Sequence, residues 1–139
     1  MSISGRQVQH YVILDAKATT GVGGSIPVMD YRNAVVKIGT SGSASLTVKA
    51  QGAVTSPTTE FTAPDFSASQ TIANNWDYVQ MIDLQDGTPI NGDTGFVVTG
   101  TDDFRLFEVN INGLDYLTFN VTARSAGAVT VVVQLSNNV

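Results

Sequence analysis

Acidic side chains in one turn-rich segment are the residues of this chain best suited to chemistry. Asp83, Asp86 and Asp93 lie there, with Asn91 between the last two. Carboxylate and amide oxygens grouped in this way are the ligands that Ca²⁺ prefers. The spacing does not match an EF-hand loop, however, and Asp-Gly and Asn-Gly pairs are also what ordinary turns require. We therefore expect plain turns and no bound metal, with the three aspartates as the only weak candidate ligands.

Groups for acid–base or nucleophilic catalysis are scarce. His10 is the single histidine, and the chain has no cysteine and no G-x-S-x-G sequence. A serine or cysteine nucleophile needs a histidine beside it. Glu60 and Glu108 are the only glutamates that could act as a glycosidase acid, but Glu108 alternates along a predicted strand with residues that look structural. We expect no enzymatic activity and no cofactor.

Four aromatic residues are candidates for contacts with a partner. Trp76 and Tyr78 fall on one face of a predicted strand, while Phe61 and Phe66 stand alone in a segment rich in Pro, Thr and Ser. Core packing is the favoured interpretation of the first pair. The alternative is an aromatic anchor at a subunit interface or a platform for carbohydrate, because Trp and Tyr are over-represented in such contacts.

The elements that hold these residues are predicted to be β-strands. Apolar residues recur at every second position on both sides of the turn signal Ser125-Ala126-Gly127. The series before the turn is Leu117, Phe119, Val121 and Ala123, and the series after it is Val129, Val131, Val133 and Leu135. A period of two indicates antiparallel strands that each bury one side. About eight such strands at regular spacing predict an all-β fold, an antiparallel β-sandwich that is jelly-roll-like or, alternatively, immunoglobulin-like.

Two turn signals predict hairpins between neighbouring strands. The segment 39–43 separates strands predicted at 34–38 and 44–50, which is the pattern of a hairpin with a flexible loop. Asn112-Gly113 is the strongest signal for a tight hairpin, because both central residues of such a turn favour positive φ.

Length and charge limit the remaining possibilities. The 139 residues predict one domain, 1–139, with a flexible N-terminal arm at 1–7. Charged residues make up only 14% of the chain, the net charge is −5, and basic residues are scattered singly, so we expect no direct nucleic-acid binding. The sequence also lacks a long apolar run and a recognisable signal peptide. We therefore expect no membrane partner and synthesis in the cytoplasm.

Four stretches resemble small structural proteins of tailed bacteriophages, of the capsid decoration (cement) type. They are DFSASQTIANNWDYVQMIDLQDG (65–87), INGDTG (90–95), GTDD (100–103) and FEVNINGL (107–114). The resemblance implies a virion protein on the outer capsid surface that binds the major capsid protein and stabilises the head through contacts between subunits. It also implies a homo-oligomer, often a trimer. The alternative is a carbohydrate- or receptor-binding head-fibre or tail component.

Overall fold

The computed structural model describes residues 8–54, 76–100 and 104–137, and every regular element among them is a β-strand. These strands are β1 (Val8–Lys17), β2 (Gly21–Val22), β3 (Ile26–Pro27), β4 (Asn33–Ala53), β5 (Trp76–Val79), β6 (Met81–Asp83), β7 (Pro89–Ile90), β8 (Phe96–Thr99), β9 (Phe104–Val109) and β10 (Tyr116–Ser136). Within the described ranges no helix is long and apolar enough to cross a membrane.

The ten described strands form one antiparallel sheet. Its main order is β1-β10-β4-β9-β6-β7, with β2 and β3 paired to β10, and β5 and β8 paired to β4. The prediction of an all-β, antiparallel fold is confirmed. The structure differs from the expected eight-stranded sandwich because its strands belong to a single continuous sheet.

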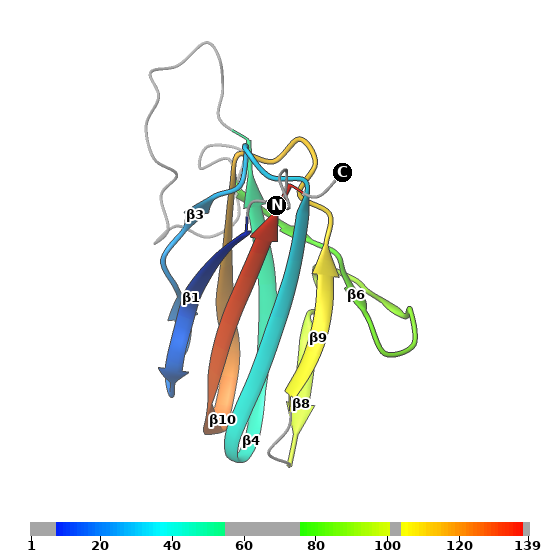
Figure 1. Cartoon of the computed structure of the whole chain (residues 1–139). Helices are drawn as coiled ribbons and strands as arrows, with labels where there is room; N and C mark the ends of the chain where they lie inside the picture. The colour runs from blue at the N-terminus through cyan, green and yellow to red at the C-terminus, as the bar shows by residue number, and fades with distance from the viewer. Residues whose placement is uncertain (1–7, 55–75, 101–103, 138–139) are drawn as a thin grey trace, which may run out of the picture.

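This sheet is bent across its two longest strands, β4 and β10, which have 21 residues each. Both strands turn over near the bottom of Figure 1. Residues 128–136 of β10 pair with residues 33–41 of β4, and residues 116–126 pair with residues 45–53. Gly42 and Gly127 lie at the two turns with φ of 75° and 81°, a left-handed conformation that glycine adopts without a steric penalty.

Both predicted hairpins are wrong, although their turns exist. The segment 39–43 lies in the bend of β4, and each half of that strand pairs with β10. At Asn112-Gly113 the chain does turn, with the Leu114 N–H donating to the Ile111 carbonyl at 3.0 Å, but β9 and β10 lie on opposite sides of β4. Turn residues specify a local reversal, whereas strand pairing depends on residues distant in sequence.

The core includes residues from both halves of the bent sheet. Apolar residues from both halves of β4 and β10 belong to one buried cluster, which includes Val36, Val48, Phe119 and Val131. The predicted apolar positions of β10 are buried except Ala123, which is exposed, and Thr118 between Leu117 and Phe119 is buried as well. The register shifts between Val121 and Ala123, and such an irregularity turns the following side chains away from the core.

Candidate functional site

The predicted metal candidate Asp83 is part of an ion pair. Its carboxylate is buried (7% exposed) and accepts a hydrogen bond from the Arg105 guanidinium. The second carboxylate oxygen accepts the Gln85 N–H at 2.8 Å. Asp83 therefore ties the turn between β6 and β7 to β9, which is a structural role.

Asp86 and Asn91 stabilise turns in the same way. Asp86 Oδ1 accepts the Thr88 N–H at 2.9 Å, and this hydrogen bond lowers the pKa of the Asp86 carboxyl. Asn91 Oδ1 accepts the N–H groups of Asp93 and Thr94 at 2.8 and 3.3 Å. Among the described residues, no three potential metal-ligating side chains gather into a group that could hold an ion.

Among the described residues, the neighbours identified for the catalytic candidates are an amide and two apolar side chains. His10 is exposed, and its Nε2 lies 2.9 Å from Gln134 Oε1. Glu108 projects from β9, and the residues paired with it on the adjacent strands are the apolar Val35 and Ile82. Glu60 lies outside the described residues.

The aromatic candidates do not form an exposed pair. Trp76 on β5 is buried (4% exposed), as its core interpretation predicts. Tyr78 is half-buried, with Lys49 Nζ 4.6 Å from its ring centroid. Burial and the Asp93 charge raise the pKa of the Tyr78 hydroxyl. Phe61, Phe66 and the predicted arm 1–7 lie outside the described residues.

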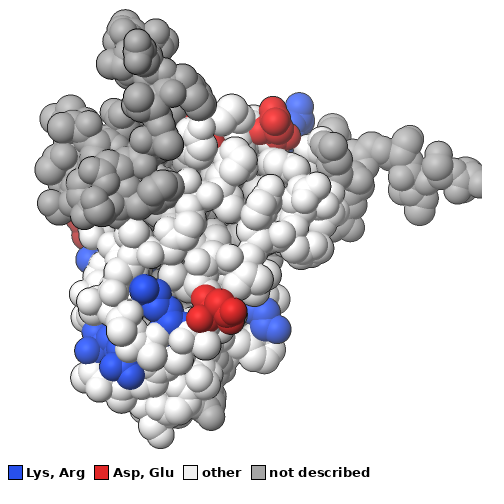
Figure 2. All heavy atoms as spheres, turned by 90° about the vertical axis from the view of Figure 1, so that its left-hand side faces the viewer, with Lys and Arg blue, Asp and Glu red and all other residues white. Residues whose placement is uncertain are grey.

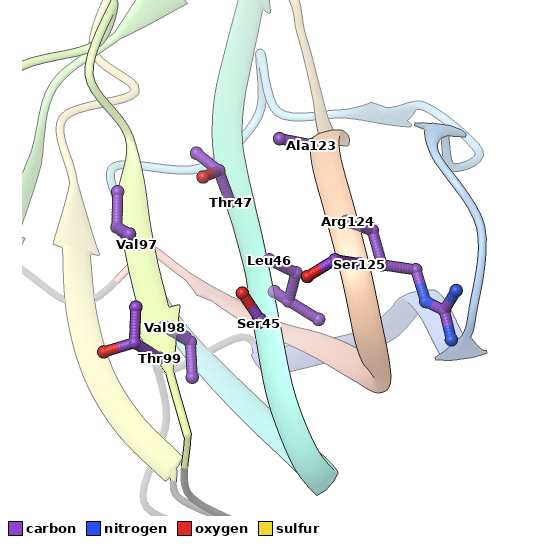
Figure 3. Close-up of a pocket in the computed structure, with 9 residues that line it drawn as sticks. All are labelled: Ser45, Leu46, Thr47, Val97, Val98, Thr99, Ala123, Arg124 and Ser125. Carbon is purple, nitrogen blue, oxygen red and sulfur yellow. The ribbon is translucent and has the colours of Figure 1, made fainter.

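A depression of about 270 Å³ lies beside the bend, over β8, β4 and β10. In Figure 3, Ser45, Thr47 and Thr99 lie along two neighbouring strands, and the Arg124 guanidinium points away from them. Arg124 Nε instead donates to the Gly127 carbonyl at 2.8 Å. The depression therefore brings together hydroxyl groups without an acid, a base or an inward-pointing cation.

The most distinctive surface is the outer side of the sheet formed by β1, β10, β4 and β9, which faces the viewer in Figure 1. We call it the outer apolar face; its apolar residues are Val12, Val35, Phe104, Leu106 and Val132. Val12 is 60% exposed, Phe104 58% and Leu106 43%. Pairing places Val12, Val132, Lys37 and Leu106 in one row across four strands. Exposed apolar side chains gathered on one face are typical of a site for association.

The centre of this face is a shallow depression of about 200 Å³ between neighbouring strands. Its lining consists of His10, Val35, Lys37, Leu106, Val132 and Gln134. Lys37 Nζ also lies 4.7 Å from the centroid of the Phe104 ring. This surface was not predicted from the sequence. The available signal was that Val35, Leu106 and Val132 are apolar at positions expected to face solvent.

Charge is sparse on the face of the molecule that Figure 2 shows. Figure 2, which views the molecule from the left-hand side of Figure 1, shows basic and acidic side chains in small separate groups among neutral ones. Neither sign forms a continuous patch there, in keeping with the 14% of charged residues in the chain.

Comparison with solved structures shows a shared fold. The chain resembles the SPBc2 prophage-derived protein YomS with a TM-score of 0.69 and 15% sequence identity, over 98% of both chains. It also resembles the PBSX exported protein XepA with a TM-score of 0.70 and 12% identity, over 98% of this chain and 40% of XepA. The sequence matches no protein-family model, and no curated protein matches it.

These comparisons correct the functional prediction. The chain was expected to be a capsid decoration protein, but the similar structures are a prophage-derived protein and an exported protein. The capsid and cement assignment is therefore wrong. The turn-and-strand patterns behind that resemblance are demands of the β-fold, which proteins of different function share. The head-fibre or tail alternative falls with it, since the burial of Trp76 also removes the expected aromatic platform.

Proposed function

We propose that this chain is a non-catalytic protein of phage origin that acts outside the cytoplasm by docking its outer apolar face onto another protein. The observation that carries the proposal is the row Val12, Val132, Lys37 and Leu106 across β1, β10, β4 and β9, in which every residue except Lys37 is apolar. Val12 and Leu106, at the two ends of this row, are both exposed. Water contact with such side chains is unfavourable, so covering them favours association.

We propose that the protein is not catalytic because its acidic side chains have structural surroundings. The carboxylates of Asp83 and Asp86 accept hydrogen bonds that close turns, and Glu108 projects among apolar neighbours. Purified protein should therefore hydrolyse neither chromogenic glycosides nor chromogenic esters. Turnover that is lost in the Glu108→Gln variant would overturn this part of the proposal.

The bent sheet is suited to presenting such a face. We propose that its two halves act as the two layers of a sandwich, because core residues from both halves pack against one another. In that arrangement the buried sides of β10 and β4 rest on the core. Their outer sides are left as a rigid, flat surface, which loses little conformational entropy when it binds.

Site-specific photo-crosslinking tests the docking surface. A benzophenone amino acid replaces Leu106 on the outer apolar face, or Val97 as the matched control. Val97 is 55% exposed but lies on β8 in the other half of the sheet. Irradiation of cells that produce the protein should give a discrete adduct from position 106 and none from position 97. No adduct at position 106, or equal adducts at both, would overturn the proposal.

Location outside the cytoplasm is tested separately. XepA, whose fold this chain shares, is described as an exported protein, and the proposal extends that property to this chain. Fractionation of producing cells should recover the protein outside the cytoplasmic fraction, with a cytoplasmic enzyme as the marker for lysis. Recovery only with that marker would overturn the export proposal.

A further inference from the structure

We infer that the partner of the outer apolar face is the same face of a second copy of this chain, related by a two-fold axis. The inference rests on the proposed docking function and names its partner. It concerns the surface defined by Val12, Val35, Phe104, Leu106 and Val132, together with the two charged residues among them, Lys37 and Glu108.

The shape of the face suits a second sheet. Its central residues alternate with core residues on straight, paired segments; Val132, for example, lies between the fully buried Val131 and Val133. Two sheets pack face to face when their side chains interdigitate across a flat interface. An identical face offers such a surface, because its branched and aromatic side chains lie in the same rows.

The charges of Lys37 and Glu108 favour a second copy of the chain over a partner whose binding surface is mainly acidic or mainly basic. Lys37 and Glu108 lie on adjacent strands, one row apart, because Lys37 pairs with Leu106 and Val35 pairs with Glu108. The ion pair that the structure records among its described residues joins Arg105 to Asp83, so neither Lys37 nor Glu108 takes part in it. A strongly acidic or basic partner would oppose one of these two charges.

A two-fold axis would place an opposite charge beside each of these two residues. If the axis lies in the interface as the perpendicular bisector of the line from Lys37 to Glu108, Lys37 of each copy meets Glu108 of the other. An isologous interface repeats every contact in this way, and two-fold dimers are the commonest homo-oligomers. The trimer expected from the sequence depended on the capsid resemblance, which is wrong, whereas the dimer depends on residues of this face.

Charge exchange combined with sedimentation tests the inference. The wild-type chain should sediment as a monomer–dimer equilibrium that depends on concentration. Lys37→Glu and Glu108→Lys should each weaken dimerisation by about tenfold or more, because like charges then meet across the axis. The double variant should recover dimerisation, and an equimolar mixture of the two single variants should form a heterodimer. Lys49→Glu, on the other half of the sheet, is the matched control and should leave the equilibrium unchanged.

The outcomes separate this inference from the docking function on which it depends. A wild-type chain that stays monomeric at millimolar concentration, or forms a larger oligomer insensitive to the charge exchange, would overturn the two-fold dimer. If position 106 then crosslinks to a protein of different mass, the docking function stands and only the identity of the partner is wrong. If position 106 gives no adduct at all, both proposals fail.

Discussion

Replacing Gly127 by alanine probes the bend that divides the sheet into two halves. Gly127 has a φ of 81°, and a Cβ there would lie 2.5 Å from Ala44 Cα and 2.8 Å from the Ser41 carbonyl oxygen. Gly42 in the opposing turn has a similar φ of 75°, but its nearest obstacle is Gly127 Cα at 3.8 Å. An alanine would therefore experience similar backbone strain at either position, whereas the space available for its Cβ differs between them.

The expected losses of stability follow from this difference. An alanine in the left-handed region costs about 1–2 kcal/mol, and the reduced entropy of the unfolded chain returns about 0.4–1 kcal/mol. Gly42→Ala should therefore lower the free energy of unfolding by about 1 kcal/mol. Gly127→Ala adds the displacement of the backbone at Ala44, comparable to overpacking a core at about 1–3 kcal/mol. Its total loss should be about 2–4 kcal/mol.

Urea denaturation, followed by the fluorescence of Trp76 and by far-ultraviolet circular dichroism, measures both losses. The two variants and the wild type are compared at one low protein concentration, since association shifts apparent stability. Gly127→Ala should unfold at a clearly lower urea concentration than Gly42→Ala, with a similar slope of the transition. Equal losses, or a larger loss in Gly42→Ala, would refute the close approach of the two bends.

Three further perturbations follow from single contacts. Asp83→Asn should lower the free energy of unfolding by about 1–3 kcal/mol in thermal denaturation, because it removes the charge that faces the partly buried Arg105; a loss no larger than that of the exposed Asp86→Asn would contradict this. The folded-state pKa of Asp86 is lowered, so its contribution to stability is present above about pH 4 and disappears as the pH falls through that lower pKa; a carboxyl titration by NMR with a midpoint at or above 3.8 would be inconsistent with it. Gln51 is buried and its Oε1 accepts no hydrogen bond from any of the described residues, so Gln51→Leu should leave the urea midpoint unchanged or raise the stability by up to about 1 kcal/mol; a loss above about 1 kcal/mol would show that the amide is needed.

Much of the fold was readable from the sequence because the alternation of apolar residues is local. The buried series Val129, Val131, Val133 and Leu135 on β10 follows from a period of two without knowledge of any partner strand. The hairpins were predicted wrongly because glycine-rich segments mark reversals of many kinds. At Gly42 the reversal is a bend within one long strand, whose halves pair with β10.

The candidate surface depended on which strands become neighbours. Val12, Val132 and Leu106 are far apart in sequence, and only the register of β1, β10, β4 and β9 aligns them. Each alone is an unremarkable exposed apolar residue of the kind that most proteins carry. Likewise, the acidic segment that contains Asp83, Asp86 and Asn91 was a candidate metal site from its sequence. In the structure, side-chain oxygens of these residues accept hydrogen bonds from nearby backbone N–H groups.

The sequence by itself determined that this protein is all-β and antiparallel, since the apolar period of two and the turn-forming residues act over a few neighbouring positions. It also determined a chain of low charge in which catalytic side chains are scarce. Only the tertiary structure decided that the ten strands of the described ranges share one bent sheet and that scattered apolar residues meet on its outer side. Those outcomes depend on pairing between distant segments, and that pairing is set by packing of the whole core.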